Sequence, residues 1–276
     1  MNKAMSEART IAERNCILRG SVGSTVHGLN VTGQDDLDEM GVCIEPPDYV
    51  LGLRDFEQWV YRTQPEGVRS GHGDLDLTIY GLRKFVRLAA KGNPSILVLL
   101  FVPRIMVSVR TTLGEELQSM ADAFASKIAI HKFLGYMVAQ KERLLGERGQ
   151  MRVHRPELIE THGFDVKYAM HALRLGYQGI EFSETGRITL PMPEATRAVV
   201  RAVRRGEHAL AEVRSMYEEI EAKLRLALTS SPLPQEPDWY RINSFLIRCY
   251  MAHWKSDHRV RLAIGQRLVV AEAKEP

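Results

Sequence analysis

The chain has 276 residues, of which 45% are hydrophobic and 26% are charged, and its formal net charge is +3. This composition excludes a disordered chain and predicts a globular, soluble protein with one large or two modest cores. No apolar run of about 20 residues, no signal peptide and no Lys/Arg block stand out, so we expect a cytoplasmic protein with no membrane partner that tolerates a polyanionic partner but does not require one.

The first predicted elements lead to a glycine-serine turn. Residues 2–14 form a charged helix in this prediction and residues 16–20 a short strand, followed by Gly23-Ser24-Thr25-Val26-His27-Gly28. Gly23 lets the backbone bend and approach a ligand, and Ser24 can cap a short helix or bond a phosphate oxygen. A helix that opens at such a turn offers backbone N–H groups to an anion. Gly23 and Ser24 are therefore candidate phosphate contacts.

Two carboxylates stand at the start of the next predicted strand, residues 36–44. Asp36 and Asp38 are two positions apart, so in a strand both side chains point to the same face, about 7 Å apart along the chain. Hard oxygen ligands of this kind suit Mg2+. From Asp-x-Asp alone, an ordinary polar turn that enters a strand remains the alternative.

A further strand is predicted over residues 74–80, where polar and apolar residues alternate. Asp74 and Asp76 fall on one face, and Leu75, Leu77 and Ile79 fall on the other. If this strand neighbours the preceding one, it brings a third acid to the same site. Between the two strands, residues 48–58 are expected to form a loop or short helix. Residues 61–73 are expected to form a mobile loop in which Arg62 and Arg69 are candidate phosphate contacts, with a solvated loop as the alternative.

The rest of the chain is predicted to be mainly helical. Helical spacing covers residues 80–91 and 95–102, and a short return strand is expected within 102–109. From about residue 112 the pattern stays helical. The basic and aromatic segment from residue 239 is a weak nucleic-acid candidate, with an oligomer contact as an equal alternative.

The predicted helix 165–175 carries a second informative cluster. Lys167, His171 and Arg174 stand at i, i+4 and i+7 and so share one helical face. Three potential cations on one side can hold a nucleoside triphosphate, with Lys supplying charge and Arg a planar fork. On the residues alone, a basic solvated face is an equal alternative.

The positions Gly23, Ser24, Asp36, Asp38 and Asp76 resemble the motif of the nucleotidyltransferase superfamily that shares the polymerase-beta palm. Outside the motif, four further segments are similar to a bacterial and phage branch of stand-alone predicted nucleotidyltransferases, so that the resemblance covers most of residues 15–225. One departure from the pattern is Val98, where relatives often carry Glu. The further segments are Gly41-Val42, Leu82-Arg83-Lys84-Phe85, Gly92-Asn93-Pro94 and the stretch 167–174.

This resemblance implies an α+β fold. It predicts a small mixed β-sheet palm flanked by helices over residues 1–110 and a mainly helical C-terminal domain over residues 111–276 that completes the nucleotide and acceptor site. It also implies catalysis and metal binding by Asp36, Asp38 and Asp76, with Asp74 as the second choice for the third acid. The expected cofactor is a pair of Mg2+ ions, with Mn2+ as an alternative. The expected nucleotide-binding residues are Gly23, Ser24, Lys167, His171 and Arg174.

The implied activity is transfer of a nucleoside monophosphate from an NTP, the co-substrate, to an acceptor hydroxyl with release of pyrophosphate. RNA or a tRNA end is the preferred acceptor. A protein side chain or a small molecule is the second enzymatic reading. A nucleotide-binding module without turnover is the non-enzymatic one, and the presence of all three acids argues against it. The sequence leaves the acceptor, the preferred base and the oligomeric state open.

Overall fold

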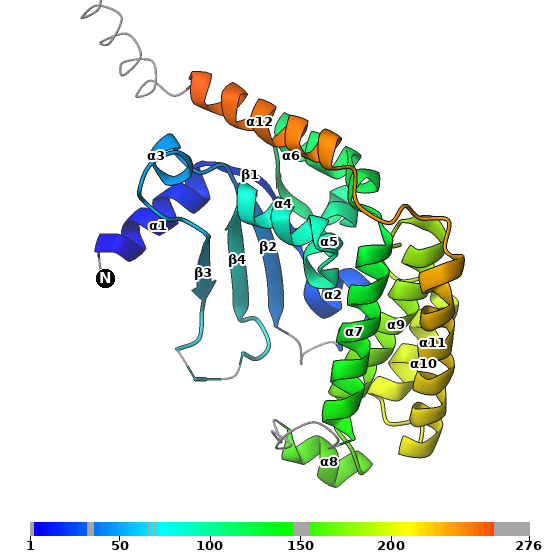
Figure 1. The fold of residues 1–276 in the computed structure, drawn as a ribbon. Coiled ribbons are helices and arrows are strands. Elements are labelled where there is room, and N and C mark those ends of the chain that lie inside the picture. The colour runs from blue at the N-terminus through cyan, green and yellow to red at the C-terminus, as the bar shows by residue number, and fades with distance from the viewer. Residues whose placement is uncertain (1–2, 32–35, 66, 69, 146–154, 257–276) are drawn as a thin grey trace, which may run out of the picture.

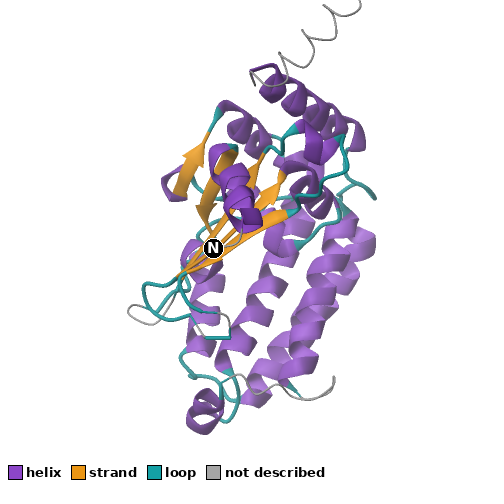
Figure 2. Ribbon diagram, turned by 90° about the vertical axis from the view of Figure 1, so that its left-hand side faces the viewer, coloured by secondary structure: helices purple, strands orange, loops and turns teal. Residues whose placement is uncertain are grey.

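The computed structural model describes residues 3–31, 36–65, 67–68, 70–145 and 155–256, which form a mixed β-sheet and, beside it, a group of long helices (Figures 1 and 2). Helices also lie against the sheet itself. This arrangement confirms the predicted α+β fold class. Within the described ranges, no helix combines the length and the apolar character that a membrane span needs.

The sheet has five strands, and its central pair is parallel. In chain order the strands are β1 (Cys16–Ser21), β2 (Leu37–Cys43), β3 (Gln58–Arg62), β4 (Leu75–Gly81) and β5 (Val107–Arg110). Their order across the sheet is β3-β4-β2-β1-β5. β2 runs parallel to β4, and every other neighbouring pair is antiparallel. The ends at which β2 and β4 begin therefore lie side by side.

The helices fall into those near the sheet and those of the bundle. The helical elements that lie near the sheet in the first part of the chain are α1 (Lys3–Arg14), α2 (Gly23–His27), α3 (Pro47–Val50), α4 (Leu82–Ala90), α5 (Pro94–Phe101), η1 (Arg104–Met106), α6 (Thr112–Ser119) and η2 (Ala121–Phe124). Those that follow are α7 (Lys127–Leu144), α8 (Pro156–His162), α9 (Val166–Thr185), α10 (Glu194–Arg204) and α11 (Leu210–Ser230). The last, α12 (Trp239–Ser256), packs on α4 and η2 beside the sheet (Figure 1).

Two apolar layers cover the two faces of the sheet. On one face, Trp59, Leu77 and Ile79 pack with the buried residues of α1. On the other face, Met40 and Val42 belong to the main core, which continues through α4 and α5 into the helical bundle. The strand alternation of apolar side chains thus places one side of β2 against α1 and the other side against the helices that follow.

Two glycines let the bundle helices approach closely. A Cβ at Gly176 would lie 2.8 Å from the sulfur of Met137, and one at Gly179 would lie 2.8 Å from Cβ of Phe133. Both distances are shorter than real Cβ contacts, so α9 packs against α7 at a separation that only glycine permits. α9 is therefore the central helix of the bundle, in contact with α7, α10 and α11.

β3 corrects the prediction of a loop at the start of residues 61–73. Gln58–Arg62 is an edge strand that pairs antiparallel with β4. Only Trp59 of its five residues is buried, so the strand has almost no apolar alternation of its own. Its conformation comes from hydrogen bonding to β4, a contact between segments distant in the chain. Arg69 of the same predicted loop lies outside the described residues.

The last described helix returns to the sheet domain through a buried carboxylate. Glu45 accepts hydrogen bonds from the Leu82 backbone N–H at 2.9 Å and from the Tyr250 hydroxyl at 2.7 Å. The indole N–H of Trp254 donates to the Glu45 backbone carbonyl at 2.9 Å. Burial raises the pKa of Glu45, and the bonds from the Tyr250 hydroxyl and the Leu82 N–H oppose the shift. The predicted tail of this region from residue 257 onward lies outside the described residues.

Candidate active site

Three carboxylates converge where β2 and β4 begin. Asp38 stands opposite Asp76 in the parallel register, and the Leu37 N–H donates to the Asp74 carbonyl at 2.7 Å just before it. Asp36 lies immediately before β2. One oxygen from each of Asp36, Asp38 and Asp76 lies within 4.8 Å of the others, and all three residues are partly exposed. These three residues are called the carboxylate edge below.

The glycine-serine turn lies directly against this edge. Gly23 has φ +65°, which favours glycine, and a Cβ at this position would overlap the Asp38 carboxylate. The Val22 N–H donates to the Asp38 carbonyl at 2.8 Å, which fixes the turn to β2. Gly23 opens α2, where Val22 provides no side-chain cap and Ser24 is partly exposed. The structure therefore brings Gly23 into contact with Asp38, as the predicted site required.

Asp76 is held by the strand beside it and by the following loop. Arg62 of β3 stands opposite Asp76, and its Nε donates to Oδ1 at 2.9 Å. The Ser70 hydroxyl lies 3.1 Å and 3.0 Å from the two Asp76 oxygens, and Arg62 also donates to Ser70 at 2.6 Å. Arg62 therefore belongs to strand β3 and not to the predicted loop, and it contacts the site by pairing with Asp76.

Asp74, the second choice for the third acid, caps the loop that precedes β4. Its Oδ2 accepts from the Gly71 N–H at 2.7 Å, and its Oδ1 accepts from Thr63 at 3.0 Å and from Gln64 at 2.5 Å. The Gly71 bond is the main cause that lowers the pKa of Asp74. Among the described residues, the carboxylate cluster comprises Asp36, Asp38 and Asp76 and does not include Asp74.

The basic face of α9, which comprises Lys167, His171 and Arg174, reaches α2 through Arg174. This arginine is 7% exposed and its NH1 contacts Nε2 of His27, a residue of α2 that is 1% exposed. Because arginine only donates, Nε2 of His27 accepts from Arg174, and the side-chain amide of Gln178 lies 3.1 Å from Nδ1 of the same ring. Burial and Arg174 lower the pKa of His27. Arg174 thus joins the central bundle helix to the glycine-serine helix.

The other two residues of this face lie nearer to solvent. His171 Nε2 is 3.1 Å from Arg174 NH2, and this guanidinium is the main cause that lowers the pKa of His171. The His171 ring is therefore neutral at pH 7, although the residue is exposed. Lys167 is partly exposed in the first turn of α9, where Asp165 caps the helix by accepting from the Lys167 N–H at 3.0 Å. The face thus holds two cations and a neutral imidazole.

The carboxylate edge offsets part of the pKa shift that burial imposes on Arg174. Burial lowers the pKa of Arg174 to about 10, and the charge of Asp38 opposes the shift. The bundle and the carboxylates are therefore electrostatically coupled through this one side chain. A small cavity of about 200 Å³ also opens at the start of β2, lined by Asp38 together with Ser21 and Thr25.

Two residues of this arrangement were not assigned from the sequence. His27 belongs to the glycine-serine motif, yet nothing local shows that an arginine 147 residues away contacts it. Gln178 follows Arg174 by four positions on α9, and NH1 of Arg174 lies 3.5 Å from its amide oxygen. That i, i+4 spacing was a usable signal, because residues four apart are neighbours on a helix.

The donor set of the carboxylate edge fits a hard divalent cation. Ligands of one Mg2+ lie about 2.0–2.1 Å from it, so two of them are at most about 4.2 Å apart. The observed oxygens lie within 4.8 Å of one another, so a displacement of each by a few tenths of an ångström brings them into that range. Three like charges at this separation also repel one another unless a cation lies among them. The residues present therefore suit Mg2+ or Mn2+ bound together with phosphate oxygens.

Residues 1–248 match a protein-family model, RlaP, described as "RNA repair pathway DNA polymerase beta family". The match contains the whole sheet, the carboxylate edge and the bundle. A solved structure, the nucleotidyltransferase-like protein from Exiguobacterium sibiricum 255-15, is 13% identical, with 82% of this chain and 72% of that chain covered and a TM-score of 0.29. This similarity is too low to support an argument. No curated protein gives a significant match.

Proposed function

Because the chain belongs to the RNA repair pathway DNA polymerase beta family, we propose that it is a metal-dependent nucleotidyltransferase that moves a nucleoside monophosphate from an NTP to an acceptor hydroxyl. The observation that supports this most strongly is the convergence of Asp36, Asp38 and Asp76 within 4.8 Å, with the Gly23 turn packed against Asp38. Nucleotidyl transfer needs backbone donors that hold the phosphates next to carboxylates that hold the metal, and this arrangement supplies both.

In this proposal Asp36, Asp38 and Asp76 hold Mg2+, or Mn2+ in its place. When bound, the metal ions would neutralise the triphosphate and stabilise the attacking and leaving oxygens. Asp38 connects the glycine turn with the other carboxylates, because its backbone is hydrogen-bonded to the turn and it lies opposite Asp76. Asp76 lies at the far side of the cluster from the turn, where its carboxylate can accept the proton of the acceptor hydroxyl.

The chain's other residues bind and orient the nucleotide. The uncapped first turn of α2 presents backbone N–H groups and the Ser24 hydroxyl to the phosphates. Lys167 supplies a mobile charge for the triphosphate. Arg174 orients α2 through His27, and the neutral His171 ring offers a single N–H donor on Nδ1, since its Nε2 faces Arg174. Release of pyrophosphate completes the transfer.

We propose RNA as the acceptor. The family description places the matching family in an RNA repair pathway. Four arginines and one aspartate line one cavity, an excess of three basic side chains that equals the net charge of +3 of the whole chain. These observations favour a phosphodiester strand over a neutral small molecule or a protein side chain.

The test is incubation of the protein with each of the four NTPs, labelled on the α-phosphate, together with Mg2+ or Mn2+ and total RNA or cell lysate. The control is a double variant, Asp36→Asn with Asp38→Asn. We expect label in RNA with the unmodified protein alone, and the labelled NTP identifies the preferred base. Label in a protein or small-molecule band would replace RNA as the acceptor, and equal labelling by the double variant would refute the role of the carboxylates.

A further inference from the structure

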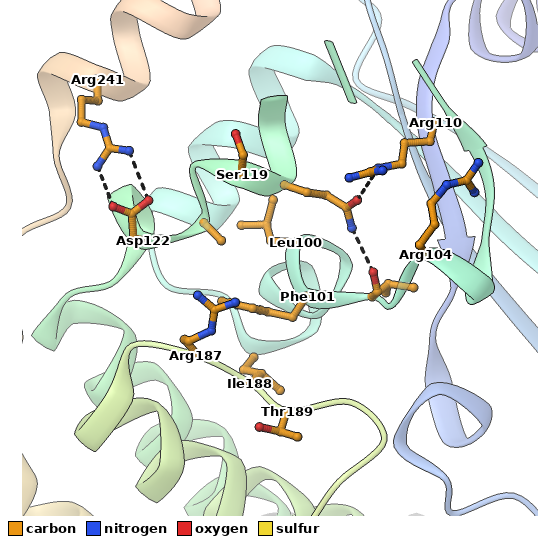
Figure 3. A pocket seen from close by; sticks show the side chains of 13 residues that line it. Leu100, Phe101, Arg104, Arg110, Ser119, Asp122, Arg187, Ile188, Thr189 and Arg241 are labelled. Atoms are coloured by element: carbon orange, nitrogen blue, oxygen red, sulfur yellow. Dashed lines mark hydrogen bonds and ion pairs between the residues drawn. The ribbon is translucent and has the colours of Figure 1, made fainter. Parts of the chain in front are cut away.

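A cavity of about 560 Å³ lies away from the carboxylate edge, between the end of α5, the η1–β5 segment, α6 with η2, the connector after α9, and α12 (Figure 3). Its volume is that of a typical ligand site. Four arginines and one acid are the charged residues of its lining. Because the whole chain has only three more basic than acidic residues, this cavity concentrates positive charge.

The four arginines that line this cavity come from four different segments (Figure 3). Arg104 belongs to η1, Arg110 to β5, Arg187 to the connector and Arg241 to α12. Arginine binds phosphate through a planar fork of donors, and a set from several walls can contact successive phosphates. A single solvated helix face does not produce this arrangement, because there the charges diverge into solvent.

Contacts within the protein hold two of these arginines in place, and some N–H donors of each guanidinium remain available to a ligand. Arg110 Nε donates to Gln118 at 3.2 Å, and its NH2 lies 3.2 Å from Glu115. Arg241 pairs with both oxygens of Asp122, at 2.7 Å and 3.2 Å. Each guanidinium has five N–H donors, so both retain donors for a ligand.

The other two arginines are less engaged. Arg104 is exposed, and its NH1 donates a hydrogen bond to the Val107 carbonyl at 3.3 Å. Arg187 is exposed, and its guanidinium forms no hydrogen bond or ion pair with any residue in the described ranges. The charge of these two side chains is therefore available to a ligand.

The lining also has an apolar part that suits a base. Phe101 is partly exposed at the end of α5, and Ile188 follows Arg187 in the connector. An aromatic ring beside arginine forks is the usual means by which proteins bind unpaired RNA, with bases stacked and phosphates held by charge. Since the only acid of the lining is already paired with Arg241, the cavity lacks the carboxylate set that a metal-bound triphosphate needs.

The connector links this cavity to the catalytic end of the molecule. Three residues beyond Thr189 of the lining, the Met192 N–H donates to the His27 carbonyl at 3.2 Å, at the last residue of α2. α2 is five residues long, about 7 Å along its axis, and its other end is the Gly23 turn at Asp38. The cavity and the carboxylate edge therefore lie toward opposite ends of one short helix.

We propose that this arginine cavity binds the phosphodiester backbone of the single-stranded RNA acceptor and holds the strand while its terminal hydroxyl lies at the carboxylate edge. The identity of the ligand rests on the proposed function, since RNA is the acceptor proposed there. Direct binding, however, does not depend on catalysis. The two proposals can therefore fail separately.

The experiment measures binding of a fluorescently labelled single-stranded RNA by anisotropy over a range of salt concentrations. The variants are Arg187→Glu and Arg104→Glu, and the matched control is Arg214→Glu, an exposed arginine of α11 outside the cavity. We expect each cavity variant to weaken RNA binding by about tenfold or more and to reduce the salt slope by about 1, with the control unchanged. Thermal unfolding of each variant confirms that the fold is retained.

Equal RNA affinity of the cavity variants and the control would overturn the proposal. Displacement of RNA from the Asp36→Asn/Asp38→Asn variant by inorganic pyrophosphate at stoichiometric concentration would also overturn it, because the cavity would then bind a small phosphate compound. The Asp36→Asn/Asp38→Asn variant should bind RNA normally. If RNA binding depends on the cavity arginines while no RNA is labelled, the cavity assignment stands and the proposed function fails.

Discussion

The carboxylate edge and the basic face of α9 both gather like-charged side chains, but the protein uses the two sets of charge differently. The edge brings Asp36, Asp38 and Asp76 together at a partly exposed position. On α9, in contrast, Arg174 points inward, and its donors meet His27 and His171. One region presents charge to a ligand, and the other uses it largely to join two parts of the protein.

This difference teaches how a charged cluster should be interpreted. Like charges that converge without equal internal compensation favour binding of an external counter-ion. A buried charge, in contrast, needs internal partners, because leaving it unpaired costs several kcal/mol. Exposure and the direction of the hydrogen bonds therefore separate a ligand site from a structural joint, although the two clusters look alike in the sequence.

The sharpest test of the comparison is replacement of a carboxylate at the edge. Asp38→Asn and Asp76→Asn should each lower nucleotidyl transfer by about 10³-fold or more, because each variant removes a negative ligand of the proposed metal. Single-turnover kinetics with labelled NTP measures the change. Asp74→Asn is the matched control and should be much milder, since Asp74 caps a loop. The opposite ranking of Asp74 and Asp76 would overturn the assignment of the third acid.

The next test displaces a carboxylate without changing its charge. Gly23→Ala places a Cβ against the Asp38 carboxylate and strains a residue at φ +65°. We expect transfer to fall by about 10²-fold, because a shift of about 1 Å in a catalytic group has that effect. Gly135→Ala on α7 is the control, since its Cβ would meet nothing within 4 Å. Normal turnover by Gly23→Ala would show that the turn does not position Asp38.

A third pair of variants separates the joint from the ligand contact on α9. Arg174→Ala should destabilise the protein by about 2–4 kcal/mol, because it removes the donor to buried Nε2 of His27 and to the amide oxygen of Gln178. Lys167→Ala should leave the melting temperature nearly unchanged and raise KM for the NTP. Thermal unfolding and steady-state kinetics on both variants test this division. A stable Arg174→Ala protein would contradict the structural role of that arginine.

The smallest expected effect is a pH dependence of stability. Burial holds the native pKa of His27 below its ordinary value, so the unfolded state binds more protons once the pH falls below about 6.5. The free energy of unfolding should therefore decrease on acidification, with a contribution from His27 of up to about 1.4 kcal/mol per pH unit. His27→Gln retains an acceptor for Arg174 and removes this titration.

Denaturant unfolding at pH 5 and pH 7 compares the two proteins. The difference in stability between these pH values should be smaller in His27→Gln than in the unmodified chain. Because the other histidines are the same in both proteins, the change in slope reports on His27 alone. Identical slopes would show that His27 is not held neutral by its surroundings.

The site was largely predictable because its key signals are local. The i, i+2 spacing of Asp36 and Asp38, the alternation around Asp76 and the glycine at position 23 each follow from the periodicity of a strand or the freedom of a turn. The structure confirms that the three acids meet and that Gly23 lies against them. Their roles in catalysis and metal binding remain proposals.

Signals that depend on a distant partner were missed or left open. β3 was not predicted, because an edge strand with one buried residue is defined by its pairing with β4. Asp76 was preferred to Asp74 through the family resemblance alone, since both have the same alternation and only the loop contacts of Asp74 separate them in the structure. His27 was not assigned, because its partner lies on α9.

The sequence by itself determined the turn and the spacing of the acids, because these depend on a period of two residues and on backbone freedom within a few positions, and the family resemblance supplied the fold class. Only the tertiary structure decided that Arg174 is buried against His27 and that arginines of four separate segments meet in one cavity. The reason is physical: packing and charge pairing depend on distances in space, and chain separation does not encode those distances.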